Sequence, residues 1–141
     1  MRELKIGSAF ETFKVSGENG ECEISFCPTD MYFVEKIYDI IENLDERQNK
    51  LEQALSKAEG RGIFAVARKA DAEMRETIDG LLGENTSSTL YGNTHIYASA
   101  DGVPLWADLL LAILDCVGDT NVREKAATNP RIAKYTSKYH K

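Results

Sequence analysis

The sequence predicts an α+β fold, mainly helical, in which an N-terminal β-hairpin precedes a long helical hairpin and a buried third helix. Three observations predict it. Residues 10–26 alternate apolar and polar side chains on both sides of a turn, which is the period of a strand. Residues 31–57 and 63–82 repeat apolar side chains every three or four positions, as amphipathic helices do. Residues 104–118 are apolar around most of a helical circumference, which is typical of a buried helix.

The hairpin is predicted to consist of the strands Glu11–Val15 and Glu21–Phe26. The residues between them include Asn19 and Gly20, and Asn-Gly pairs tolerate the positive φ angles of hairpin turns. Alternation places the apolar side chains of each strand on one face. Because two strands alone are marginally stable in water, a helix is expected to cover this face. The face consists of Phe13, Val15, Cys22, Ile24 and Phe26.

The first helix is predicted from Met31 to Lys57, with Thr29 or Asp30 as its N-cap. At 1.5 Å per residue it would be about 40 Å long, whereas a compact domain of this size is about 37 Å wide. It is therefore expected to form a spine or a projecting arm. Beyond Asp45 the apolar stripe thins among charged side chains, as in a helical hairpin or a coiled-coil seam.

The second helix is predicted from Ile63 to Leu82, with Gly83 as its C-cap and a charged outer face. A short glycine-containing turn between two helices predicts an antiparallel pair. Residues 83–102 are rich in Gly, Ser, Thr and Asn and are predicted to form a long loop, anchored to the core through Leu90-Tyr91-Gly92. The charged face consists of Arg68, Lys69, Asp71, Glu73, Arg75 and Glu76.

The third helix is predicted to start near Pro104, with Asp101 as its N-cap, and to end at Gly118. It should be the central element of the core. A short further helix is expected near residues 121–127, followed by a break at Asn129-Pro130. The predicted organisation is a single compact domain over residues 1–128 and a basic C-terminal tail over residues 129–141, and 141 residues are enough for one such domain.

Charge is distributed unevenly along the chain. The net charge is -6, but residues 123–141 carry six basic side chains against one acid, whereas the preceding 122 residues carry 11 basic and 22 acidic side chains. An acidic body repels phosphate backbones, so nucleic acid is disfavoured as a partner of the folded domain. The basic tail leaves a weaker DNA-binding alternative open. Its cations are Arg131, Lys134, Lys138 and Lys141.

Composition indicates a cytoplasmic protein. The longest apolar stretch, Val103–Val117, is interrupted by two aspartates, so no membrane span is predicted. Residues 1–5 lack the apolar region of a secretion signal. Three cysteines cannot pair completely, and Cys22, Cys27 and Cys116 are interpreted as reduced core residues.

The chain shows no pattern of residues that predicts catalysis. Its two histidines, His95 and His140, lie at no metal-ligand spacing from each other or from a cysteine pair, so no metal site is predicted. Residues 83–89 lack the Gly-Lys-Ser/Thr ending of a phosphate loop and follow a helix rather than a strand. The sequence therefore predicts a protein that is not an enzyme and that needs no cofactor.

Three segments together resemble a known family. They are Phe26–Phe33 at the end of the hairpin, Leu81–Gly92 in the centre and Lys134–Tyr139 near the end. In these segments the chain is similar to the small tail assembly chaperones, and related tail proteins, that phages and prophages of Gram-positive bacteria encode. The similarity covers most of the chain, including its acidic character, its short β start, its helices and its basic end.

The resemblance implies a non-enzymatic chaperone, in the cytoplasm of the bacterial host, that binds the long helical tape-measure protein during tail morphogenesis. It also implies contacts with tail subunits and self-association into a homo-oligomer. A groove between two helices accepts an amphipathic helix through anchors three and four residues apart. The candidate client-binding residues are Leu44, Leu51, Leu55 and Phe64, with the alternative that they pack against each other. A structural virion subunit, a tail or head-tail joining protein that stays in the particle, is the competing interpretation.

Overall fold

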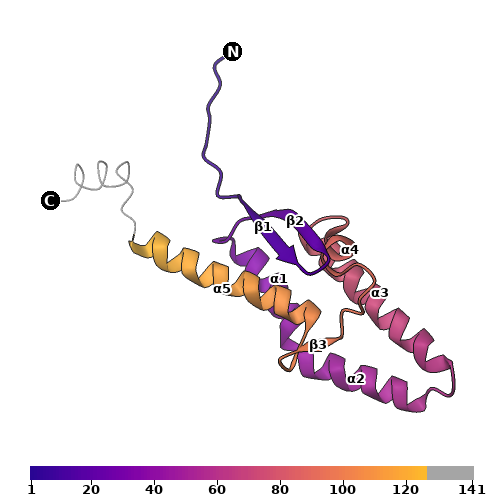
Figure 1. The fold of residues 1–141 in the computed structure, drawn as a ribbon. Helices are drawn as coiled ribbons and strands as arrows, with labels where there is room; N and C mark the ends of the chain where they lie inside the picture. Colours follow the sequence, from indigo (N-terminus) through magenta and orange to yellow (C-terminus); the bar gives the residue numbers. More distant parts are fainter. Residues whose placement is uncertain (127–141) are drawn as a thin grey trace.

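The computed structural model describes residues 1–126, and its α+β architecture confirms the predicted fold class (Figure 1). A two-stranded antiparallel hairpin comes first and helices follow. The cations of the predicted tail, Arg131, Lys134, Lys138 and Lys141, lie outside the described residues. The elements are β1 (Glu11–Gly17), β2 (Gly20–Phe26), α1 (Met31–Glu42), α2 (Leu44–Lys57), α3 (Gly62–Leu82), α4 (Thr86–Tyr91), β3 (Ser99–Ala100), β4 (Val103–Pro104) and α5 (Leu105–Ala126).

The N-terminal hairpin has the predicted apolar face. Its register pairs Phe13 with Ile24 and Glu11 with Phe26. The ring of Phe26 stacks between those of Phe13 and Phe33, with centroids 4.6 and 4.8 Å apart, so the hairpin joins α1 through aromatic contacts. At the tip, a Cβ atom on Gly17 would lie 3.2 Å from the Leu90 carbonyl oxygen. Glycine thus lets the backbone of the hairpin approach α4 closely.

The predicted single helix over Met31–Lys57 is wrong, because the chain turns at Asn43 and forms α1 and α2 instead. Asn43 has φ -95° and ψ 19°, outside the helical region, and its carbonyl oxygen accepts the first bond of α2 from the Arg47 amide at 2.8 Å. Asparagine has a low helix propensity, which is consistent with a boundary here, although its side chain makes no capping bond to α2. The N-cap prediction for α1 is confirmed, since Asp30 Oδ1 accepts from the Tyr32 amide at 2.9 Å.

The helix α3 confirms the second predicted helix and ends at the predicted cap, Gly83, whose amide bonds the Asp79 carbonyl oxygen at 2.9 Å. The prediction of a long loop over residues 83–102 is wrong, because this segment contains α4 and the small β3-β4 hairpin. The predicted N-cap role of Asp101 is also wrong. Asp101 and Gly102, with φ of 54° and 80°, form the two-residue turn between β3 and β4.

Polar side chains of α3 bind this returning segment. Asp71 accepts from the Ile96 amide at 2.9 Å and from Arg75 Nε at 2.8 Å, and Arg75 Nη2 donates to the Thr94 carbonyl oxygen at 2.7 Å. Asp79 accepts from both the amide and the hydroxyl of Ser87. Asp71 and Arg75 are therefore half-buried structural residues, not members of a solvated charged face as the sequence suggested.

The core lies where α5 packs against α1, the hairpin and the 86–97 segment, and it confirms α5 as the central buried helix (Figure 1). The predicted end at Gly118 is wrong, because α5 continues to Ala126. Thr120 is buried and its hydroxyl donates to the Cys116 carbonyl oxygen at 2.9 Å, so packing outweighs the poor helix propensity of glycine. The fully buried large side chains include Ile37, Met74, Ile78, Ile96, Trp106 and Leu110.

Across the described residues, no helix combines the length and apolarity that crossing a membrane requires.

Candidate functional site

The helical hairpin of α2 and α3 forms an arm that extends from the core (Figure 1). No residue of α2 is buried, so this helix contributes little to the core. Between α2 and the first half of α3 lies an open groove of about 610 Å³, which we call the arm groove. Its apolar lining is provided by Leu51, Ala54, Val66 and Ala70, and its polar lining by Asn43, Glu46, Arg47, Lys50, Lys69, Glu73 and Tyr97.

The four candidate client-binding residues do not share one site. Leu51 lines the arm groove, half-buried. Leu44 packs against the hydrophobic core. Leu55 is half-buried near the end of α2, and Phe64 is 54% exposed near the start of α3, where the Arg61 guanidinium lies 5.7 Å from its ring centroid. The structure thus places Leu51 in the groove and the other three outside its lining.

Charges of both signs border the arm groove. Lys50 pairs with Glu46 at 3.2 Å, one helical turn apart on α2, and both side chains are well exposed. On the opposite wall, Lys69 and Glu73 are exposed on α3. At the inner end, burial raises the pKa of the Tyr97 hydroxyl, and the neighbouring Arg47 guanidinium opposes this rise. An apolar floor between charged rims suits an amphipathic helix of mixed charge.

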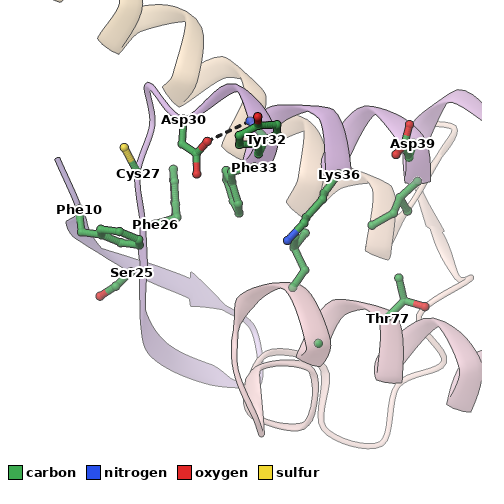
Figure 2. Close-up of a pocket in the computed structure, with 13 residues that line it drawn as sticks. Phe10, Ser25, Phe26, Cys27, Asp30, Tyr32, Phe33, Lys36, Asp39 and Thr77 are labelled. Carbon is green, nitrogen blue, oxygen red and sulfur yellow. Dashed lines mark hydrogen bonds between the residues drawn. The ribbon is translucent and has the colours of Figure 1, made fainter.

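A second open groove, of about 500 Å³, lies between α1, the second half of α3 and the end of the β1-β2 hairpin; we call it the aromatic groove (Figure 2). Tyr32 is 80% exposed and Phe10 is 67% exposed at this groove. Figure 2 shows Lys36 extending from α1 into the space that faces α3. Its lining consists of Phe10, Ser25, Phe26, Cys27, Asp30, Tyr32, Phe33, Lys36, Asp39, Ile40, Thr77, Gly80 and Leu81.

The sequence did not predict the aromatic groove. Its walls come from three separate elements, so no local pattern reveals it. One signal was present: Tyr32, which lines the groove, is a large aromatic residue off the buried stripe of α1 and is 80% exposed. Large apolar side chains gathered on a surface mark interaction sites more often than single exposed ones do.

His95 and Cys22 belong to residue types that commonly carry chemistry, and both have structural roles in the described part of the chain. His95 Nδ1 accepts from the Tyr97 amide at 3.1 Å, so its Nε2 carries the proton that bonds the Ala67 carbonyl oxygen at 2.7 Å. Cys22 packs against the core and burial raises the pKa of its thiol, which lowers its reactivity. Within residues 1–126, no three His, Cys, Asp or Glu side chains come together as ligands for a metal ion.

No protein family model, no curated protein and no solved structure matches the chain.

Proposed function

We propose that this protein is a non-enzymatic tail assembly chaperone of a phage or prophage of Gram-positive bacteria, and that it binds the tape-measure protein during tail morphogenesis. One observation carries the proposal: the arm groove is open, apolar at its floor and charged at its rims, and it lies on a helical hairpin that extends from the core. Such a groove accepts a client helix without any chemical step.

The exposure of α2 supports a binding role for the arm. An isolated helix of 14 residues is marginal in water, and α2 buries none of its residues in this fold. Leu51 and Leu55, four positions apart, lie on the same side of the helix and are only half-buried. A client helix that packs in the arm groove would bury Leu51 further and stabilise α2.

The charge of the body supports a basic or mixed client. Residues 1–122 carry 22 acidic against 11 basic side chains. This excess attracts Lys-rich segments and accelerates encounter, while contacts in the groove determine how long the complex lasts. The tape-measure protein implied by the family resemblance is long and helical, so it offers many such segments.

The experiment begins with the tagged protein, purified from a lysate of its native host after prophage induction, with mass spectrometry of the proteins that accompany it. We expect a very long, helix-rich protein to copurify with the bait. We also expect this complex to be absent from finished particles. Recovery of the bait inside purified particles would instead make it a structural virion subunit. Recovery with nucleic acid alone would contradict a protein client.

A pair of variants assigns the binding to the arm groove. Leu51→Asp places a charge on the groove floor and should lower recovery of the client at least about tenfold, the effect of one lost anchor. Gln53→Asp adds the same charge to the same helix at an exposed position outside the lining and should leave recovery unchanged. Circular dichroism must show equal helix content in both variants. Equal recovery by the two variants would refute the assignment.

A further inference from the structure

The N-terminal segment, residues 1–10, is an exposed apolar extension of the fold. It runs away from the body before β1 begins (Figure 1). Leu4 and Ile6 are 94% and 95% exposed, and a Cβ atom on Gly7 would meet nothing within 4 Å. Large apolar side chains gathered on one exposed segment are unusual in a monomer and mark an interaction site.

The aromatic groove offers this segment a matching surface. Its floor includes the buried Phe26 and the half-buried Phe33 and Leu81, which leave apolar area open to solvent. An extended segment places Leu4 and Ile6 on one side, because side chains alternate along a strand. Two neighbouring apolar side chains of one segment can thus enter an apolar groove together, while the residues between them remain at its rim.

The charges of the two surfaces are complementary in sign and in order. Along α1 the groove presents Asp30, then Lys36, then Asp39, that is, negative, positive, negative. Along the N-terminal segment, Arg2, Glu3 and Lys5 run positive, negative, positive. In an extended chain Arg2 lies on the side of Leu4 and Ile6, whereas Glu3 and Lys5 lie on the other side, from which their side chains reach the charged rim. The outer pair of groove charges is about 14 Å apart along a helix, and the outer pair of segment charges is about 10 Å apart in an extended chain. Flexible Lys and Arg side chains cover the difference.

Among residues 1–126, Lys36 and Asp39 of the groove have no competing ion pair, and the described ion pairs lie elsewhere. Asp30 uses Oδ1 to cap α1, and this bond leaves Oδ2 for a cation. These charged groups, which lie beside open apolar surface, are therefore available to pair with a segment whose charges have the opposite signs.

We propose that residues 1–10 of one copy bind in the aromatic groove of a second copy, and that residues 1–10 of the second copy bind in the aromatic groove of the first. The direction of the segment favours a second copy over its own groove, because the segment leaves the groove at Phe10 and extends away from the body. A reciprocal exchange also gives a closed two-fold dimer, the commonest symmetry of homo-oligomers. The inference concerns self-association and does not depend on the proposed client.

Sedimentation velocity of the full chain over a range of concentrations tests the dimer. Replacing Leu4 and Ile6 together, by Leu4→Ser and Ile6→Ser, should raise the dissociation constant at least about tenfold. Asn49→Ser with Gln53→Ser adds the same two serines at exposed positions of α2, outside both the segment and the aromatic groove, so it should leave the constant unchanged. A wild-type chain that stays monomeric at every concentration would overturn the proposal.

A charge reversal tests the groove itself. Lys36→Glu should weaken the dimer, and adding Glu3→Lys in the same chain should restore it, because the pair regains opposite signs. Both positions are exposed, so neither change should alter the fold. If Glu3→Lys restored none of the lost dimer affinity, Lys36 would not be the residue that pairs with Glu3 of the segment.

A cross-link separates exchange between copies from folding back within one copy. One tagged chain carries Ile6→Cys, and a second chain with another tag carries Gly80→Cys, where a Cβ atom meets nothing within 4 Å. A short bis-maleimide should join the two tags, in excess over a pair that contains only the native cysteines. A chain that carries both changes and forms only an internal cross-link would show that the segment folds back on itself, and would overturn the exchange.

Discussion

Removing the Asp71 carboxylate should strongly destabilise the fold. Asp71 accepts one bond from the amide of the fully buried Ile96 and one from Arg75 Nε, at 2.9 and 2.8 Å. Asp71→Ala leaves the buried amide unsatisfied, which costs about 1–3 kcal/mol, and removes a charged hydrogen bond worth about 1.5–3 kcal/mol. Because both charged side chains are about one fifth exposed, water offsets part of the loss, and we expect about 3 kcal/mol.

Urea unfolding monitored by Trp106 fluorescence measures this change, since the indole is fully buried in the folded chain. Asp71→Asn should cost about half as much, because its amide oxygen still accepts from Ile96 while the charge is lost. Glu76→Ala, an exposed carboxylate on the same helix, should change stability by less than about 0.5 kcal/mol. Equal urea concentrations at the unfolding midpoints of Asp71→Ala and Glu76→Ala would contradict this expectation.

Three further changes have directions that the structure determines, and urea unfolding checks each of them. Burial, and then the nearby Asp108 carboxylate, raise the pKa of the Tyr91 hydroxyl in the folded chain. Above about pH 10 this tyrosine ionises in the unfolded chain but not in the folded one, so the free energy of unfolding should fall by about 1.4 kcal/mol per pH unit. Tyr91→Phe should make that alkaline decline shallower, and an unchanged slope would contradict it. Gly102→Ala, at φ 80°, should cost about 1 kcal/mol, whereas Gly7→Ala in open space should be neutral. Gly118→Ala, exposed inside α5, should stabilise by about 1 kcal/mol, and no gain would mean that the helix does not continue through this position.

The elements that the sequence predicted are those whose signal is local and continuous. The β1-β2 hairpin follows from alternation, and α3 follows from its apolar repeat and from Gly83 at its end. The cap at Asp30 also follows from residues that are neighbours in the chain. Each of these features is determined within a few residues, so a pattern in the sequence is sufficient to find it.

The elements that the sequence missed depend on contacts between distant residues. A glycine at position 118 predicts a helix end, but packing around Thr120 extends α5 beyond it. Residues 83–102 have the composition of a loop, yet Asp71 and Asp79 of α3 bind their backbone and hold a helix and a hairpin there. In the candidate sites, Leu51 lines a groove between α2 and α3, which are consecutive in the sequence. Lys36 lines a groove whose walls come from α1, α3 and the β1-β2 hairpin, so its position depends on distant contacts.

The two grooves lie along one face of α3. Val66, Ala70 and Glu73 line the arm groove, and Thr77 and Gly80 line the aromatic groove, at helical spacings of three and four residues throughout. The turn at Asn43 divides the opposite wall, so α2 borders the first half of this face and α1 borders the second half.

This arrangement would place the proposed self-association and the proposed client binding on neighbouring but separate surfaces. Leu4→Ser with Ile6→Ser should weaken the dimer and leave each copy able to recover its client, because no residue of the arm groove is changed. Leu51→Asp should have the opposite pattern, with loss of the client and an intact dimer. A variant of either groove that removed both activities would mean that the face of α3 acts as one continuous site, in which the client binds only to paired copies.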